Sequence, residues 1–88
     1  MLFMISYSFP PTVRNAAQDR FRKTGGAPGE GAKMLGRWHT VGGNSGFLLA
    51  ESSDSVALGK WMQDWSDLLS FDIVPVNDDA HVMQIIGG

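Results

Sequence analysis

The order in which strands and helices are expected along the chain is the feature that most constrains its fold. Extended segments rich in β-branched and aromatic residues predict strands at 1–9, 33–41, 46–52 and 70–76. Apolar residues at helical spacing predict helices at 12–23 and 54–68. The resulting β-α-β-β-α-β order is that of a split βαβ, or ferredoxin-like, unit. We therefore expect an α+β fold in which a four-stranded antiparallel sheet carries both helices on one face.

Capping residues support the expected helix ends. Thr12 is expected to cap the first helix, and either Ser53 or Asp54 the second. Gly25 follows the first helix as a C-terminal stop. After the last strand, Asp78 is expected to cap a short C-terminal helix. That helix would place three apolar residues on one face: Val82, Ile85 and Ile86.

Each of the two longer helices has an apolar stripe that should pack against the sheet. The inward side of the first is expected to carry Val13, Ala16, Ala17 and Phe21. Its outward, solvated side should carry Arg14, Gln18, Asp19 and Arg22. The stripe of the second consists of Leu58, Trp61, Met62, Trp65, Leu68 and Leu69. We expect both tryptophans of this stripe to fill the core.

The length of 88 residues predicts one domain, 1–88. A domain of this size buries only about 60% of the surface of its unfolded chain, so its core alone gives little stability. Because the sequence has no cysteine, no disulfide can brace it. Dense packing and oligomerisation remain as sources of stability.

Composition argues against several classes of function. A net charge of −2 disfavours nucleic-acid binding through a basic face. Two histidines without cysteine are too few for a typical structural zinc site, and the glycine-rich segment 25–31 lacks the spacing of a phosphate loop. The apolar runs are too short for a membrane span, and the N-terminus lacks the marks of a signal peptide. We therefore expect a cytoplasmic protein without a metal or organic cofactor.

The two middle strands should form a hairpin with Gly43 and Asn44 as its central turn pair. This register opposes Trp38 to Leu49 and sends alternate residues to opposite faces. One face would carry Gly36, Trp38, Thr40, Phe47, Leu49 and Glu51. The other would carry Leu35, Arg37, His39, Val41, Leu48 and Ala50. Both faces contain large apolar residues, so the face without helices should be covered by a second copy. We expect a homodimer, packed sheet to sheet into a barrel.

Several motifs carry a resemblance to a known family. They are MLFMISYSFPP, RFRKTG, EGAKMLGRWHTVG, and GFLLAES leading into SDSVALGKWMQDWSDLLSFDIVPVNDD. Over nearly its whole length the chain resembles domain of unknown function family 3303 (DUF3303), within the dimeric α/β-barrel superfamily. The resemblance implies a ferredoxin-like fold and a homodimer, and it implies little about activity.

Other members of that superfamily resemble antibiotic-biosynthesis monooxygenases, haem-degrading monooxygenases, muconolactone isomerases and stress-response proteins. Fold alone does not decide among them. A haem-degrading site would hold an Asn, a Trp and a His together. Here the first strand reads ISYS without an Asn, and His81 lies in the C-terminal tail, so the chain departs from that pattern.

Five residues are candidates for ligand binding or chemistry. His39 is the natural acid–base group and shares its expected face with Arg37. Trp38 and Glu51 share the other face, where an aromatic wall and a carboxylate would suit a small-molecule pocket. Tyr7 could donate a hydrogen bond to a ligand. The structural alternatives are an edge-strand His39, a Trp38 that fills the dimer core and a Glu51 paired with an arginine. The sequence does not decide which of the two sheet faces the helices cover.

Three functions remain open at this point. The first is a homodimer that binds a small apolar or aromatic ligand in the barrel cavity, between the two sheets. The second is a cofactor-independent enzyme of the monooxygenase or isomerase type, with His39 or Glu51 as base. The third is a purely structural dimer with a filled interior.

Overall fold

The computed structural model describes residues 1–87 and has the predicted order of elements. The elements are β1 (Leu2–Ser8), the 3₁₀ turn η1 (Pro11–Val13), α1 (Arg14–Thr24), β2 (Ala32–His39), β3 (Ser45–Ser52), α2 (Ser55–Gln63), β4 (Ser70–Val76) and α3 (Asp79–Ile85). The β-α-β-β-α-β order and the α+β class are confirmed.

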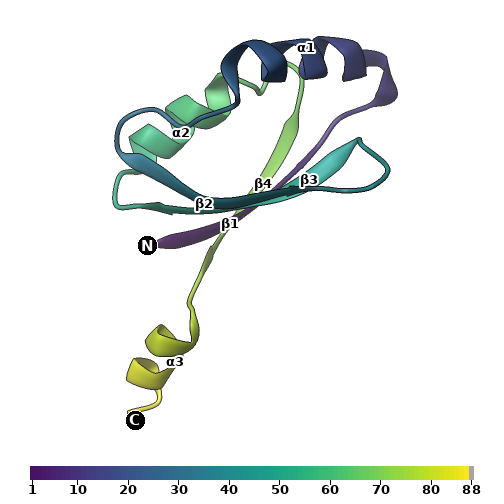
Figure 1. Cartoon of the computed structure of the whole chain (residues 1–88). Helices are drawn as coiled ribbons and strands as arrows, with labels where there is room; N and C mark the ends of the chain where they lie inside the picture. Colours follow the sequence, from purple (N-terminus) through teal and green to yellow (C-terminus); the bar gives the residue numbers. More distant parts are fainter. Residues whose placement is uncertain (88) are drawn as a thin grey trace.

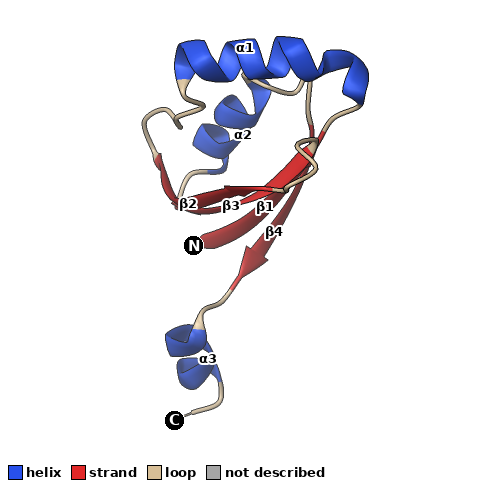
Figure 2. Ribbon diagram, turned by 45° about the vertical axis from the view of Figure 1, so that its right-hand side comes forward, coloured by secondary structure: helices blue, strands red, loops and turns tan. Residues whose placement is uncertain are grey.

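The four strands form one antiparallel sheet in the order β2-β3-β1-β4. β1 and β3 are therefore central, while β2 and β4 are the edges. Both α1 and α2 cover the same face of the sheet, and α3 extends away from it beyond the end of β4 (Figures 1 and 2). The ferredoxin-like arrangement predicted from the sequence is confirmed.

The core lies between α2 and the two central strands. Ile5 of β1 is fully buried, and it packs with Leu48 and Ala50 of β3. From α2, Leu58, Trp61 and Met62 complete the cluster, at the i, i+3 and i+4 spacing that puts side chains on one helix face. α2 is the element that anchors the helical layer to the sheet.

The helix ends confirm three expected capping residues and correct one. Asp54 caps α2 by accepting hydrogen bonds from the backbone N–H groups of Val56 and Ala57. Gly25 ends α1 in the left-handed conformation, and Asp78 forms a capping box at the start of α3. Thr12 was expected to cap the first helix, but it lies inside η1. The two prolines before it favour that tight turn, so Val13 takes the N-cap position.

The second helix is shorter than predicted. α2 ends at Gln63, and residues 64–68 continue as successive turns. Their backbone bonds include Trp65 N–H to Met62 O and Leu68 N–H to Trp65 O, each 3.0 Å long. These tighter turns still bury the Trp65 side chain at the end of the core.

The hairpin register differs by two residues from the prediction. Trp38 pairs with Phe47, whereas Leu49 had been expected opposite it. The loop is longer because Gly43, at φ 86°, closes a turn through its N–H bond to Thr40 O. A shift of two residues preserves the alternation of faces. A bulge at Leu35 changes the grouping near the start of β2, so that Met34 packs against the core in its place.

The face of the sheet that carries no helix is open and exposes several large apolar side chains. Trp38 is 57% exposed and Phe47 49% exposed, although both sit within strands. Other exposed apolar side chains on this face are Met4 and Val74. The exposed large apolar residues of α3 are Val82, Met83 and Ile85.

Among the described residues, no helix has the length and apolar character needed to cross a membrane. The cytoplasmic location stays a prediction.

Candidate functional site

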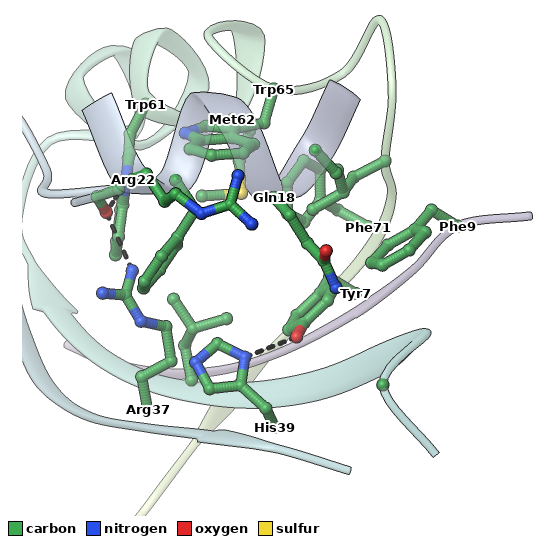
Figure 3. A pocket seen from close by; sticks show the side chains of 16 residues that line it. Tyr7, Phe9, Gln18, Arg22, Arg37, His39, Trp61, Met62, Trp65 and Phe71 are labelled. Atoms are coloured by element: carbon green, nitrogen blue, oxygen red, sulfur yellow. Dashed lines mark hydrogen bonds between the residues drawn. The ribbon is translucent and has the colours of Figure 1, made fainter. Parts of the chain in front are cut away.

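A cavity of about 500 Å³ lies between the helices and the sheet. Six aromatic residues contribute to its lining: Tyr7, Phe9, Phe21, Trp61, Trp65 and Phe71. Figure 3 shows the labelled side chains arranged around the space, with Trp61, Met62 and Trp65 on the helix side and Arg37 and His39 on the sheet side. The cavity is on the helix-covered face of one chain, whereas the sequence had suggested a space between two sheets.

The composition of α1 explains why this space is not filled. Its described apolar residues are Ala16, Ala17 and Phe21, and Ala17 is the one that is buried. A methyl group does not reach far into the layer between helix and sheet. Gln18 and Arg22, expected on the outer side of this helix, instead line the cavity and point into it (Figure 3). α1 therefore roofs the space with polar and aromatic side chains.

Tyr7 and His39 form a hydrogen-bonded pair on the cavity floor. The Tyr7 Oη and His39 Nδ1 atoms are 2.5 Å apart, and their rings meet edge to face. Tyr7 lies on β1 and His39 on β2, with Gly46 of β3 between them in both pairings. A side chain at position 46 would overlap the Tyr7 ring. The missing side chain of Gly46 thus lets two residues on non-adjacent strands meet.

Burial affects the phenol of this pair, and the tautomer of His39 decides which of the two partners donates the hydrogen bond. It raises the pKa of the Tyr7 phenol, and the nearby Arg37 charge opposes that rise. In the tautomer in which His39 Nδ1 accepts from the Tyr7 hydroxyl, the imidazole N–H is on Nε2. In Figure 3 the second ring nitrogen lies on the side of His39 that faces Arg37. The pair can therefore present a donor to the cavity.

Arg37 joins the edge strand to the end of α1. Its guanidinium donates to Gly25 O at 2.8 Å and to Gly26 O at 3.0 Å, and it lies over the Phe21 ring at 4.8 Å. Trp61 Nε1 also donates to Gly26 O, at 3.2 Å. Burial lowers the pKa of Arg37, and the interaction with Tyr7 opposes that change. The side chain is held in place by neutral carbonyls, with its remaining N–H groups available.

The structure brings together three of the five sequence candidates. Tyr7, Arg37 and His39 all line the cavity. Trp38 lies on the opposite, open face of the sheet, where its ring covers Gly36. Glu51 is exposed on that same face, opposite Lys33 in the ladder. Trp38 and Glu51 therefore do not share a pocket with the other three.

Sequence reasoning missed several residues of the cavity. Trp61 and Trp65 were expected as core residues, and they are buried, but each also forms part of the cavity wall. Phe9 and Phe71 were not singled out, and neither was Gly46. A glycine inside a strand is a recognised sign of close approach, so Gly46 was the available signal for the Tyr7–His39 contact.

The likeness to known proteins is limited to fold and family. No curated protein matches the chain. Among solved structures, Rv0793 from Mycobacterium tuberculosis is similar, with a TM-score of 0.55 and 15% sequence identity over 90% of this chain and 97% of that one. Identity this low shows a shared fold and leaves activity open. The sequence also matches DUF3303, a domain of unknown function, over residues 1–88, and the chain therefore belongs to that family.

Proposed function

We propose that this protein is a homodimer that binds a small, largely aromatic molecule in the cavity between its helices and its sheet. The observation that carries the proposal is the cavity itself, with about 500 Å³ of space and a lining to which six aromatic residues contribute. Ligand sites in proteins are typically concave, of about 300–1,000 Å³, and apolar with a few convergent polar groups. Tyr7, Arg37 and His39 supply such groups here.

The wall is suited to a flat ligand. Aromatic pairs prefer offset-stacked or edge-to-face contacts, and this cavity already contains both. Tyr7 and Phe9 are stacked at 6.2 Å, while Phe21 and His39 meet edge to face at 5.6 Å. A ring inserted between the floor and Trp61 would extend these contacts. Burying such a ring stabilises the complex by about 25 cal/mol for each Å² of apolar surface removed from water.

Filling the cavity from α1 tests the proposal directly. Ala17 is buried and lines the cavity, so Ala17→Phe should occupy the ligand's space and abolish binding. Its neighbour Ala16 is exposed, so Ala16→Phe introduces the same side chain outside the cavity and should leave binding unchanged. The measurements are native mass spectrometry of protein as purified, for retained mass, and thermal shift against a library of aromatic compounds.

If the wild type retains no mass and responds to no compound, the ligand-binding proposal is wrong and a purely structural dimer is left. If Ala16→Phe and Ala17→Phe lose binding equally, the effect comes from disturbing α1 and not from filling the cavity. Circular dichroism of each variant shows whether the fold is kept.

The open face of the sheet supports the homodimer. Trp38, Phe47, Met4 and Val74 form an exposed apolar surface across all four strands. Soluble monomers seldom leave large contiguous apolar surfaces in water. A second copy is the partner that matches it best, because two such twisted sheets can pack face to face. A two-fold axis would let the same residues meet their own copies.

The Tyr7–His39 pair favours a second candidate function, turnover of the ligand by proton transfer. His39 is held by a hydrogen bond to Tyr7 at the edge of a cavity, and it can act as a base in the tautomer in which Nδ1 donates to Tyr7 Oη and Nε2 is unprotonated. An isomerase-like reaction needs no more than such a group next to an acidic C–H bond. Glu51, the other base considered, lies on the open face and is not available to this cavity.

A further inference from the structure

The charge of the cavity contrasts with the charge of the chain. The chain has a net charge of −2. Among the described residues that line the cavity, the ionisable ones are Tyr7, Arg22, Arg37 and His39, and none is Asp or Glu. Two guanidinium groups therefore face a largely apolar space without a carboxylate in its wall.

Two other cations of α1 are paired with carboxylates. Arg20 forms a paired hydrogen bond with both oxygens of Asp67, at 2.7 and 2.8 Å. Lys23 contacts Asp19 at 3.0 Å. Within residues 1–87, Arg22 and Arg37 have no such ion pair. Arg37 is partly buried and donates to two backbone carbonyls, whereas Arg22 is exposed. A partly buried cation such as Arg37, without a counter-ion, attracts an anion more strongly than a fully solvated one does.

The positions of these groups define where an anion would sit. Arg37 and His39 lie on the sheet side, and Arg22 points toward the same space from α1 (Figure 3). Arginine offers five N–H donors, and Arg37 uses two of its nitrogens on the carbonyls of Gly25 and Gly26. The remaining donors, with the free nitrogen of His39, can reach a planar acidic group. Trp65 and Phe71 lie farther from Arg37 than Trp61 does (Figure 3) and would hold the attached ring.

We infer that the ligand of this cavity is an aromatic carboxylate, with its acidic group between Arg37, Arg22 and His39 and its ring against the tryptophans of the helical layer. The inference rests on the proposed binding function and specifies the class of ligand. Arginine pairs with carboxylates through charge-assisted hydrogen bonds, which are about twice as strong as neutral ones. The charge of the ligand, and not its aromatic ring alone, should therefore decide affinity.

Two probes of nearly equal shape separate these contributions. Binding of 2-naphthoate and of 2-naphthamide to the full chain is measured by isothermal titration calorimetry at pH 7 and low salt. The acid should bind at least tenfold more tightly than the amide. Arg22→Gln and Arg37→Met should each reduce affinity for the acid about tenfold and leave affinity for the amide unchanged. Arg14→Gln is the control, because Arg14 lies on the same helix and contacts Asn15.

The outcomes are distinct. Equal affinity for acid and amide overturns the carboxylate inference and leaves the binding function standing. Binding of neither probe, together with a library that gives no thermal shift, overturns both. Arg37 also ties β2 to the end of α1, so its variant could disturb the fold. Arg22→Gln and the comparison of the two probes on the wild type do not depend on that contact.

Discussion

Among single residues, His39 has the position that most invites chemistry. It shares a hydrogen bond with Tyr7 and borders the cavity, while the second histidine, His81, is part of the capping box of α3. The two histidines therefore form a natural comparison, because the same substitution can be made at a cavity position and at a position on the C-terminal helix.

Replacing each histidine by glutamine tests turnover. An aromatic ketone with an acidic C–H bond, such as 2-tetralone, is incubated with the protein in deuterium oxide, and loss of the C–H signal is followed by proton NMR. If the cavity transfers protons, His39→Gln should slow the exchange by about 10²-fold or more, as expected for loss of a general base. His81→Gln should have no effect. Exchange at the uncatalysed rate with the wild type would argue against the enzymatic candidate.

Single residues also show which parts of the site could not be predicted from the sequence. Tyr7, Arg37 and His39 could be selected as candidates because phenol, guanidinium and imidazole groups can hydrogen-bond or exchange protons with a ligand. Trp38 and Glu51 were equally plausible, since alternation sorts residues into two faces without saying which face the helices cover. The composition of the two sets could not decide which face the helices cover, because each set contains large apolar residues: Leu48 is on the helix-covered face and Phe47 on the open face.

At the scale of elements, α2 depends on a defined N-terminal cap. Asp54→Ala removes the acceptor for two backbone N–H groups and should reduce the free energy of unfolding by about 1 kcal/mol. Ser53→Ala is the matched control, since Ser53 precedes the cap and is exposed. Urea denaturation at one fixed protein concentration gives both values. A loss for Ser53→Ala as large as that for Asp54→Ala would contradict this assignment.

Elements were predictable where local chemistry alone decides them. The glycine stop at Gly25 and the aspartate caps are set by residues next to the helix end. The start of α1 and the hairpin register were not, because each depends on a competing local turn. Pro10 and Pro11 favour a 3₁₀ turn over a cap at Thr12, and Gly43 closes a longer loop than the sequence suggested. The bulge at Leu35 adds one residue to β2, and no pattern in the sequence predicted it.

At the scale of the whole molecule, the open sheet face should decide the oligomeric state. We expect the wild type to sediment as a dimer at micromolar concentration. Phe47→Glu places a charge within the apolar surface and should give a monomer, because burying an unpaired carboxylate is unfavourable. Val41→Glu is the control, since Val41 is fully exposed in the hairpin loop, away from that surface. A wild-type monomer would refute the dimer.

The contact made possible by Gly46 has a consequence for how a ligand would meet this site. Tyr7 and His39 are separated by β3, so their backbones are two strand spacings apart, or about 10 Å. That separation is fixed by the hydrogen-bond ladder of the sheet and does not depend on what occupies the cavity. The polar floor is thus set in place by the folding of the chain, so a ligand would lose little entropy in ordering it.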